Sequence, residues 1–195
     1  MIGGNFVHMN TSINDQHGRG IRRSFGLLLL LPFFACSGST PKGVATIEPF
    51  DATRYMGKWY EIARLDHKFE RGLTNVTAEY SLKDDGGISV LNRGYDVEKG
   101  EWKEADGKAE FVDGPDKARL KVSFFGPFYS GYHVIALDDE YRYSMVTGDE
   151  RDYLWLLSRE KEIPEEVKQR YLKQARDQGY DVDALIWVEH DRTDG

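Results

Sequence analysis

The segment that most restricts how this chain can fold is GKWYEIAR, residues 57–64. Its residue types alternate with a period of two, which predicts a β-strand with Trp59, Glu61 and Ala63 on one face. Gly57 stands two residues before the tryptophan and lets another backbone or a large ring approach closely where the strand begins. Because a lone glycine–x–tryptophan motif also occurs by chance in unrelated sheets, a second signal has to support it.

A second alternating strand, residues 152–159, gives that support about a hundred residues later. It ends on Arg159, whose guanidinium group can lie on the Trp59 ring in a cation–π contact. We therefore predict structural roles for Gly57, Trp59 and Arg159, which would together close one end of the fold.

Between these two strands the chain alternates in six more segments, at residues 75–82, 88–95, 102–112, 118–124, 132–137 and 141–147. The turns between them are short, as an antiparallel meander requires. Eight antiparallel strands of this kind close into an up-and-down barrel whose interior holds one small ligand. Pro164 then begins a helix that ends before Gly179. The apolar stripe of this helix predicts that it packs outside the barrel, and residues 180–188 return as an edge strand beside the first strand.

Three segments resemble the lipocalin family, and within it the lipocalins of bacterial outer membranes: GKWYEIARLDHKFERGLTNVTAEYSL, KVSFFGPFYSGYHVIALD and DYLWLLSRE. The resemblance covers nearly all of residues 46–190. It implies an all-β fold, an eight-stranded antiparallel up-and-down lipocalin β-barrel with a C-terminal α-helix packed outside. It also implies storage, transport or repair work on fatty acids or lysophospholipids, and we expect no cofactor.

The N-terminal segment, residues 1–35, has the pattern of a secretory signal peptide. Three arginines precede an apolar run that ends at Ala35 and is too short to span a bilayer, which needs about twenty residues. Cys36 follows in a setting that resembles the lipobox of bacterial lipoproteins, although Phe33 stands where such boxes usually carry leucine. The resemblance implies that Cys36 is lipidated and anchors the protein to a membrane. An ordinary signal peptide with a nearby cysteine is the alternative.

We divide the chain into the signal peptide (1–35), a lipidated N-terminus with a flexible tether (36–49), the barrel (50–160), a C-terminal helix with an edge strand (161–190) and a tail (191–195). Residues 37–49 are rich in Ser, Thr, Gly and Pro, which is typical of a tether without a core of its own. We expect the tether to enter the barrel at its closed end. The expected location is the outer membrane of a Gram-negative bacterium, on the periplasmic face.

Counting by two along each strand from Trp59 and Arg159 predicts which side chains face the barrel interior. Most of these side chains are apolar and a few are polar, which is the pattern of a small-molecule site. Three alanines among them leave volume inside, which argues against a barrel filled solid by aromatic side chains. The predicted ligand-binding residues are Glu61, Ala63, Ala78, Tyr80, Val90, Asn92, Ala109, Phe111, Val122, Phe124, Tyr132, Val134, Tyr143, Met145, Tyr153 and Trp155.

Glu61 is the carboxylate in this lining, and inside an apolar barrel it needs a partner, water or a proton. Two roles remain open for it. It can bond to Arg159, Tyr80 or another tyrosine hydroxyl near the closed end, or it can receive a ligand head group. The carboxylate points to an amphipathic ligand with a long apolar tail and a polar end.

The connection between the fifth and sixth strands carries four aromatic residues beside its glycine and proline. By strand order this connection lies at the open end of the barrel, where Phe125, Phe128 and Tyr129 would form an exposed apolar rim. Such a rim marks a membrane, lipid-entry or homodimer contact. A rigid aromatic lid packed back into the barrel is the alternative.

Other functions find less support in the sequence. The chain carries no G-x-S-x-G elbow, no phosphate-cradling loop and no closely spaced histidine pair, so we expect neither an enzyme nor a metal site. Beyond residue 35 it has 23 basic and 32 acidic residues, an acidic balance that argues against nucleic acid as a partner. We predict a lipid-binding lipoprotein. The alternatives are a lipocalin-fold enzyme acting on lipids and an envelope interaction protein with a vestigial cavity.

Overall fold

A computed structural model describes residues 39–193 of the chain. The predicted signal peptide and Cys36, the predicted lipidation site, lie outside these residues. In chain order the elements are α1 (Ala52–Tyr55), β1 (Gly57–Arg64), β2 (Leu73–Leu82), β3 (Ile88–Asp96), β4 (Glu101–Phe111), β5 (Arg119–Phe125), β6 (Phe128–Leu137), β7 (Tyr143–Thr147), β8 (Leu154–Ser158), α2 (Glu165–Asp177), the 3-10 helix η1 (Val182–Ala184) and β9 (Ile186–Trp187).

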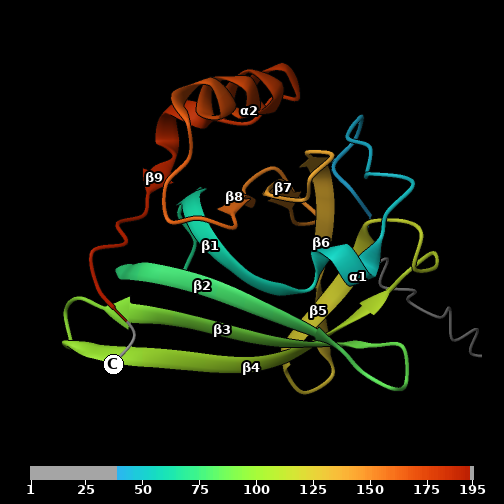
Figure 1. The fold of residues 1–195 in the computed structure, drawn as a ribbon, viewed down its shortest axis with the longest axis horizontal. Helices are drawn as coiled ribbons and strands as arrows, with labels where there is room; N and C mark the ends of the chain where they lie inside the picture. The colour runs from blue at the N-terminus through green and yellow to red at the C-terminus, as the bar shows by residue number, and fades with distance from the viewer. Residues whose placement is uncertain (1–38, 194–195) are drawn as a thin grey trace, which may run out of the picture. The chain divides into compact units, whose positions relative to one another are not determined.

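The strands form a closed antiparallel barrel because β1 pairs with β2 on one side and with β8 on the other (Figure 1). Strands β2 to β7 each pair with the strands that precede and follow them in the sequence, and β8 pairs with β7 and β1. The predicted eight-stranded up-and-down barrel is therefore confirmed. An edge strand beside β1 is confirmed, since β9 pairs with Ala63 and Arg64, but it covers only Ile186–Trp187 of the predicted residues 180–188, and Val182–Ala184 form a 3-10 helix instead.

Two separate clusters of buried apolar side chains lie on the two faces of the barrel wall. One cluster gathers Trp59 of β1, Val90 of β3 and Val134 of β6, three strands that do not pair with one another, so it fills the interior. The other contains Tyr171 and Ala175 of α2, so it lies on the outer face. Figure 1 shows α2 outside the barrel, on the side of β1, β7 and β8. The predicted outer position of the helix is confirmed.

The segment expected to be a flexible tether is instead packed against the barrel from Pro41 onward. Val44 is buried in the outer cluster, and Phe50 is buried in the inner one. The Ile47 amide donates to the Val134 carbonyl over 2.9 Å, and the Ile47 carbonyl accepts from the Ala118 amide over 3.0 Å. The composition of this segment predicted a tether, but apolar residues at every third position, 44, 47 and 50, anchor it.

The same segment reaches the barrel from the side of its open end. Arg151, in the loop between β7 and β8, donates to the Lys42 carbonyl over 2.6 Å. Phe50 lies at the opposite end, where its amide donates to the Asp116 carbonyl in the turn between β4 and β5. The expectation that the chain enters at the closed end is therefore wrong.

The predicted C-terminal tail also begins later than expected. Asn75 of β2 holds the segment after β9 because its amide donates to the Glu189 carbonyl. Its side chain donates to Asp191 over 3.0 Å and accepts from the Arg192 amide over 2.9 Å. Asn75 adopts a left-handed backbone conformation, with φ of 54°, inside an irregular stretch of β2 where this contact forms.

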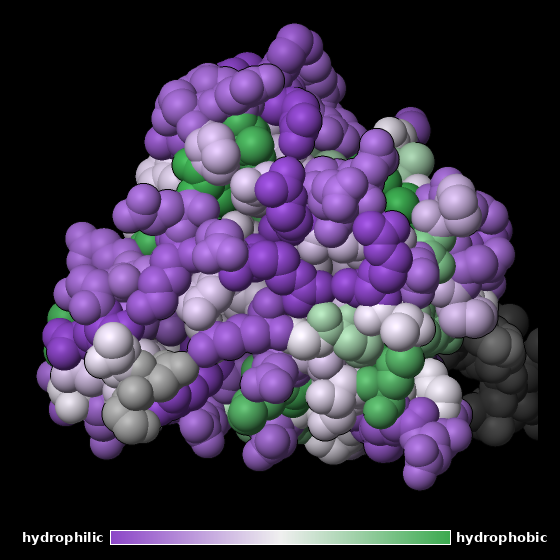
Figure 2. All heavy atoms as spheres, in the orientation of Figure 1, coloured by the Kyte–Doolittle hydropathy of each residue, from purple (hydrophilic) through white to green (hydrophobic). Residues whose placement is uncertain are grey.

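Hydrophilic side chains cover most of the face shown in Figure 2, and hydrophobic atoms are visible there mainly in small patches. Among residues 39–193, no helix combines the length and the apolar character needed to cross a membrane.

Candidate functional site

Trp59 and Arg159 form the closed base of the barrel. The Trp59 side chain is fully buried, and the Arg159 guanidinium lies 3.8 Å from its ring centroid. The same guanidinium donates to four backbone carbonyls, those of Arg54, Tyr55, Lys58 and Tyr141. Gly57 has φ of 91°, and a Cβ atom there would lie 3.5 Å from the Arg159 guanidinium. One cation thus ties β1, α1 and the turn between β6 and β7 over the tryptophan.

A network of hydroxyl groups lies above this base, inside the barrel. The Tyr55 hydroxyl bonds to the Tyr132 hydroxyl over 2.8 Å and to the Ser144 hydroxyl over 3.0 Å. The Tyr80 hydroxyl bonds to Tyr132 over 2.9 Å. Burial raises the pKa of Tyr55 to about 12 and also raises the pKa values of Tyr80 and Tyr132. These groups are therefore neutral at physiological pH and act as hydrogen-bonding groups in the interior.

A buried ionic cluster continues the polar lining toward the open end. Glu61 is 3% exposed, and its carboxylate accepts from the Arg64 guanidinium over 2.6 Å. Its side-chain partner is therefore Arg64, and not Arg159, Tyr80 or another tyrosine hydroxyl as predicted. Arg64 also donates to the Glu70 and Leu73 carbonyls, so it fastens the loop between β1 and β2 to the barrel.

The loop adds a second carboxylate and an imidazole to this cluster. Glu70 accepts from the Trp155 indole over 3.0 Å, and His67 Nε2 lies 3.0 Å from the same carboxylate. Burial raises the pKa of Glu61 well above its ordinary value, and the neighbouring Glu70 carboxylate raises it further, against the lowering effect of Arg64. The Glu61 carboxylate is thus bonded to one guanidinium and neighbours a second carboxylate, and it tends to retain a proton.

The opposite side of the lining is apolar and is built from β3 to β6. It contains Ile88, Val90, Ala109, Phe111, Leu120, Val122, Phe124 and Val134. Small residues alternate inward along β4, where Ala105, Gly107 and Ala109 pair with Asn92, Val90 and Ile88 of β3. The Phe124 ring covers Gly107 closely, because a Cβ atom there would lie 2.7 Å from the ring.

The interior is not filled solid by these side chains. Ala78, Asn92, Ala105, Val122, Tyr132 and Trp155 all face inward and are only partly buried. The Asn92 Oδ1 atom is buried and has no hydrogen-bond partner within residues 39–193. The interior therefore offers accessible apolar surface on one side and polar groups on the other, which is the composition of a small-molecule site.

Three of the predicted lining residues face outward instead. Ala63, Tyr143 and Met145 belong to the cluster that packs against α2. A bulge between Glu61 and Ala63 shifts the alternation of β1 by one residue, so Arg64 takes the inward position after Glu61. Tyr141 has φ of 57°, which breaks the alternation before β7, so Ser144 and Val146 face inward there.

The other predicted lining residues lie as counted, with Tyr153 stacked on Trp155 at the edge of the site. Counting by two missed Arg64, His67, Glu70 and Ser144. Arg64 faces inward because of the bulge in β1, and His67 and Glu70 lie in the loop between β1 and β2, whose path cannot be predicted from the sequence. Leu157 also faces the interior, and the alternation predicts this position because Leu157 stands two residues before Arg159 on the same face.

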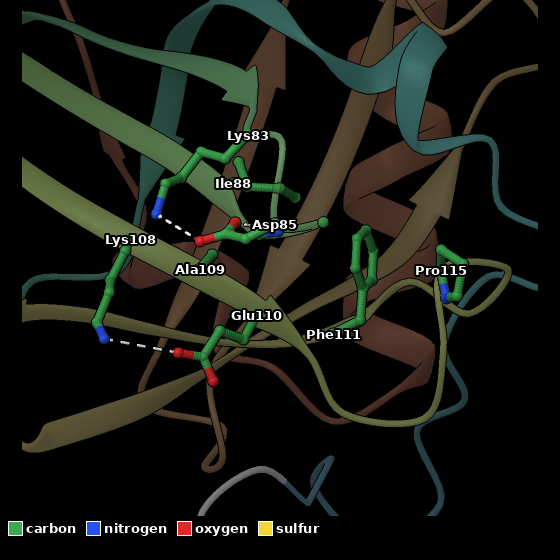
Figure 3. Close-up of a pocket in the computed structure, with 10 residues that line it drawn as sticks. Lys83, Asp85, Ile88, Lys108, Ala109, Glu110, Phe111 and Pro115 are labelled. Carbon is green, nitrogen blue, oxygen red and sulfur yellow. Dashed lines mark hydrogen bonds and ion pairs between the residues drawn. The ribbon is translucent and has the colours of Figure 1, made fainter.

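A second hollow lies at the closed end, between the turn that follows β2 and the end of β4 (Figure 3). Its volume is about 610 Å³. Ile88, Ala109 and Phe111 line it and also belong to the interior cluster. Lys83 pairs with Asp85 over 3.1 Å, and Lys108 pairs with Glu110 over 3.6 Å, at its edge (Figure 3).

Exposed apolar side chains stand at the open end on three different connections. We call these residues the rim: Phe69, Val97, Phe125 and Phe128. Phe125 is 72% exposed and Phe128 is 77% exposed, so they do not form a lid packed into the barrel. The expectation for Tyr129 is wrong, because its hydroxyl donates to Glu110 over 2.7 Å and its ring lies under Lys121 on the outer wall.

Among residues 39–193, no group of three or more histidine, cysteine or acidic side chains is arranged to hold a metal ion.

Comparison with known proteins gives a consistent match. The family model of the lipocalin-like domain matches residues 50–190. The outer membrane lipoprotein Blc of Escherichia coli K12 is 58% identical over 156 residues, covering 80% of this chain and 88% of the relative. The outer membrane lipoprotein Blc of Vibrio cholerae is 50% identical over 170 residues, covering 87% of this chain and 99% of the relative. A more distant relative, temperature-induced lipocalin-1 of Arabidopsis thaliana, is 31% identical and covers 74% of this chain and 81% of its own.

Solved structures support the same fold. Insecticyanin from the tobacco hornworm Manduca sexta superimposes with a TM-score of 0.63, at 22% identity, over 78% of this chain and 87% of its own. The cockroach allergen Per a 4 superimposes with a TM-score of 0.61, at 21% identity, over 78% of this chain and 96% of its own. At these identities the likeness bears on the fold alone.

Proposed function

Because this chain belongs to the lipocalin family, we propose that its barrel binds and carries an amphipathic lipid of the fatty acid or lysophospholipid class. The observation that carries the proposal is the division of the interior into an apolar side and a polar side, with partly buried side chains on both. The apolar side from β3 to β6 suits an acyl chain. The ionic cluster and the tyrosine hydroxyls suit a polar head.

The charges of the ionic cluster favour some head groups over others. Glu61 and Glu70 supply two carboxylates against the single guanidinium of Arg64. A free carboxylate placed beside them meets like charge in a buried site, whereas a head group with hydroxyl or ammonium donors meets acceptors. A fatty acid would bind there more readily in its protonated form than as an anion.

The membrane location is supported by the relatives and by the leader sequence. The relatives from Escherichia coli and Vibrio cholerae are named outer membrane lipoproteins. We propose that this chain is likewise anchored to the outer membrane through lipidated Cys36, on the periplasmic face. Its work there is lipid storage, transport or repair.

The packed N-terminal segment supports a barrel whose open end faces the membrane. Lys42 lies beside the loop between β7 and β8, which is an open-end connection. The six residue-to-residue steps from Cys36 to Lys42 span at most about 21 Å, less than the height of about 25 Å expected for such a barrel. An anchor on Cys36 would therefore hold the rim, rather than the base, close to the lipid surface.

A tryptophan at position 78 tests the ligand site. Ala78 faces the interior and is partly buried, so Ala78→Trp should place its ring in the ligand space and reduce lipid binding at least tenfold. Binding is measured by fluorescence titration with a fatty acid and with a lysophospholipid. Ala109 suits the test less well, because it is 5% exposed and a larger side chain there would overpack the wall.

The matched control is Glu79→Trp, which adds the same ring on the exposed outer face of the same strand. It should leave lipid binding unchanged. Normal binding by a folded Ala78→Trp protein would show that the lipid lies elsewhere. Native mass spectrometry of protein purified from cells, without added lipid, identifies the bound class directly.

The rim gives a separate prediction about lipid transfer. Changing Phe125 and Phe128 to serine should slow transfer from vesicles several-fold and leave the affinity for free lipid unchanged, because the two rings lie outside the interior. Stopped-flow transfer from labelled vesicles measures the rate. A normal transfer rate combined with loss of a homodimer in analytical ultracentrifugation would assign the rim to self-association instead.

A lipid-modifying enzyme remains the second candidate from the sequence. No observation on the described residues favours it, since the interior pairs Glu61 with Arg64 and leaves no nucleophile beside a base. Mass spectrometry of lipids after incubation with the protein separates the two functions, because a carrier returns its ligand unchanged.

A further inference from the structure

A small groove on the outer wall of the barrel gathers basic side chains in an otherwise acidic protein. It lies over β1, β2 and β4, where the segment after β9 crosses the wall, and its volume is about 120 Å³. A water molecule needs about 10–15 Å³ of such volume, so the groove can hold a small oxyanion with its oxygens. It is separate from the lipid site, because its residues point away from the interior.

Three cationic side chains from distant parts of the chain line the groove. Lys58 comes from β1, Lys161 from the connection between β8 and α2, and Arg192 from the C-terminal segment. Lys161 is held in place because its ammonium group donates to the Arg192 carbonyl over 3.1 Å. The Arg192 guanidinium lies 3.9 Å from the Tyr95 ring centroid, which orients it along the wall.

The other lining residues are donors or aromatic rings, and none of them is acidic. His190 Nε2 bonds to the Glu61 carbonyl over 2.8 Å, and its ring packs edge-on against Tyr60. Burial lowers the pKa of His190, and the charges of Lys161 and Lys58 lower it further. The imidazole thus lies in a positive electrostatic field.

Two of the nearby carboxylates are engaged beside the groove. Asp191 accepts from the Asn75 amide, and Glu104 pairs with Arg93 over 3.2 Å. Glu79 lies opposite Lys58 in the register of β1 and β2 and points to the same outer face. Three cations therefore line the groove while the acidic groups stand around it.

We propose that this groove binds a phosphate-type oxyanion, either free in solution or as the phosphate of a lipid head group. Lys58, Lys161 and Arg192 supply the positive charge, and an Arg guanidinium with two ammonium groups is a suitable donor set for phosphate oxygens. The rings of Tyr60 and Trp102 give the groove aromatic walls that suit the carbon skeleton next to a phosphate ester. The site does not depend on the lipid-carrier function, and either can fail without the other.

The test removes two cations that do not contact the interior. Isothermal titration with inorganic phosphate and with glycerol phosphate compares wild type with the Lys161→Gln, Arg192→Gln double variant. We expect the double variant to bind both probes at least tenfold more weakly. Glycerol phosphate has no acyl chain, so the lipid site does not contribute to this measurement.

Two further readouts separate this site from a general charge effect. The Lys173→Gln, Arg176→Gln variant removes the same charges from exposed positions on α2 and should bind phosphate as wild type does. The His190 pKa, followed by NMR, should rise when phosphate is added to wild type and stay constant in the double variant. Equal phosphate affinity in the double variant and the control would overturn the proposal.

Binding to lipid vesicles shows whether the phosphate belongs to a lipid head group or to a free phosphate compound. Vesicles of phosphatidylcholine with phosphatidic acid are compared with vesicles of phosphatidylcholine alone. Loss of the preference for phosphatidic acid in the double variant supports a lipid head group. A retained preference together with weakened binding of both soluble probes supports a free phosphate compound.

Discussion

Replacing Trp59 with alanine is expected to destabilise the barrel by about 3–5 kcal/mol, the usual cost of truncating a fully buried tryptophan. The side chain is fully buried, and its indole donates to the Tyr55 carbonyl over 2.9 Å. The Tyr55 ring lies 4.8 Å from the Trp59 ring, so truncation also removes support for the tyrosine network. Chemical denaturation, followed by fluorescence and circular dichroism, measures the loss.

The Arg159→Ala variant distinguishes the contribution of the Trp59 ring to stability from that of the guanidinium above it. Arg159 donates to four backbone carbonyls, so its removal should also lower stability, by less than the loss of the ring. Trp187→Ala is the control, because this tryptophan on β9 is 40% exposed. If both base variants melt within a degree or two of wild type, the base is held together in another way.

The sequence was sufficient for the architecture because period-two alternation and short turns are local signals. The pair of Trp59 and Arg159 could also be predicted, since Trp59 stands at the beginning of one alternating strand and Arg159 at the end of another. The inward-facing residues of the site could be predicted only where the period-two alternation of a strand continues without interruption. At the bulge of β1 one inserted residue shifts the alternation, so Arg64 instead of Ala63 takes the inward position. No local sequence pattern predicts this bulge.

The remaining errors come from segments whose role depends on distant partners. His67 and Glu70 read as scattered polar residues, and they become part of the interior only because Arg64 fastens their loop to the wall. The N-terminal segment has the composition of a tether, and yet Val44 and Phe50 find apolar partners on the finished barrel. Composition describes a segment alone, whereas packing depends on what the rest of the fold offers to it.

The Arg64→Met variant should also lose about 3–5 kcal/mol, because removing one member of a buried ion pair leaves the other charge uncompensated. Methionine keeps most of the volume of the side chain, so the effect reports on the lost charge and the lost hydrogen bonds to Glu61, Glu70 and Leu73. Glu61 and Glu70 would then face each other without the guanidinium. Arg71→Met is the control in the same loop, because Arg71 and its partner Asp66 are both exposed, and little change is expected there.

The pH dependence of this loss distinguishes charge from packing. The folded-state pKa of Glu61 is already raised above its ordinary value of 4.5, so its contribution to stability is full below that value and declines as the pH rises. Without Arg64 its pKa should rise further, and the stability deficit of Arg64→Met relative to wild type should grow once the pH passes the raised folded-state pKa that Glu61 has in wild type, because only the variant still loses stability there. The Arg64→Met, Glu61→Gln double variant should regain part of the stability at neutral pH, because one of the two carboxylates is then neutral. A deficit that is constant with pH, and that Glu61→Gln does not relieve, would show that Arg64 acts through packing and backbone contacts rather than by neutralising the carboxylates.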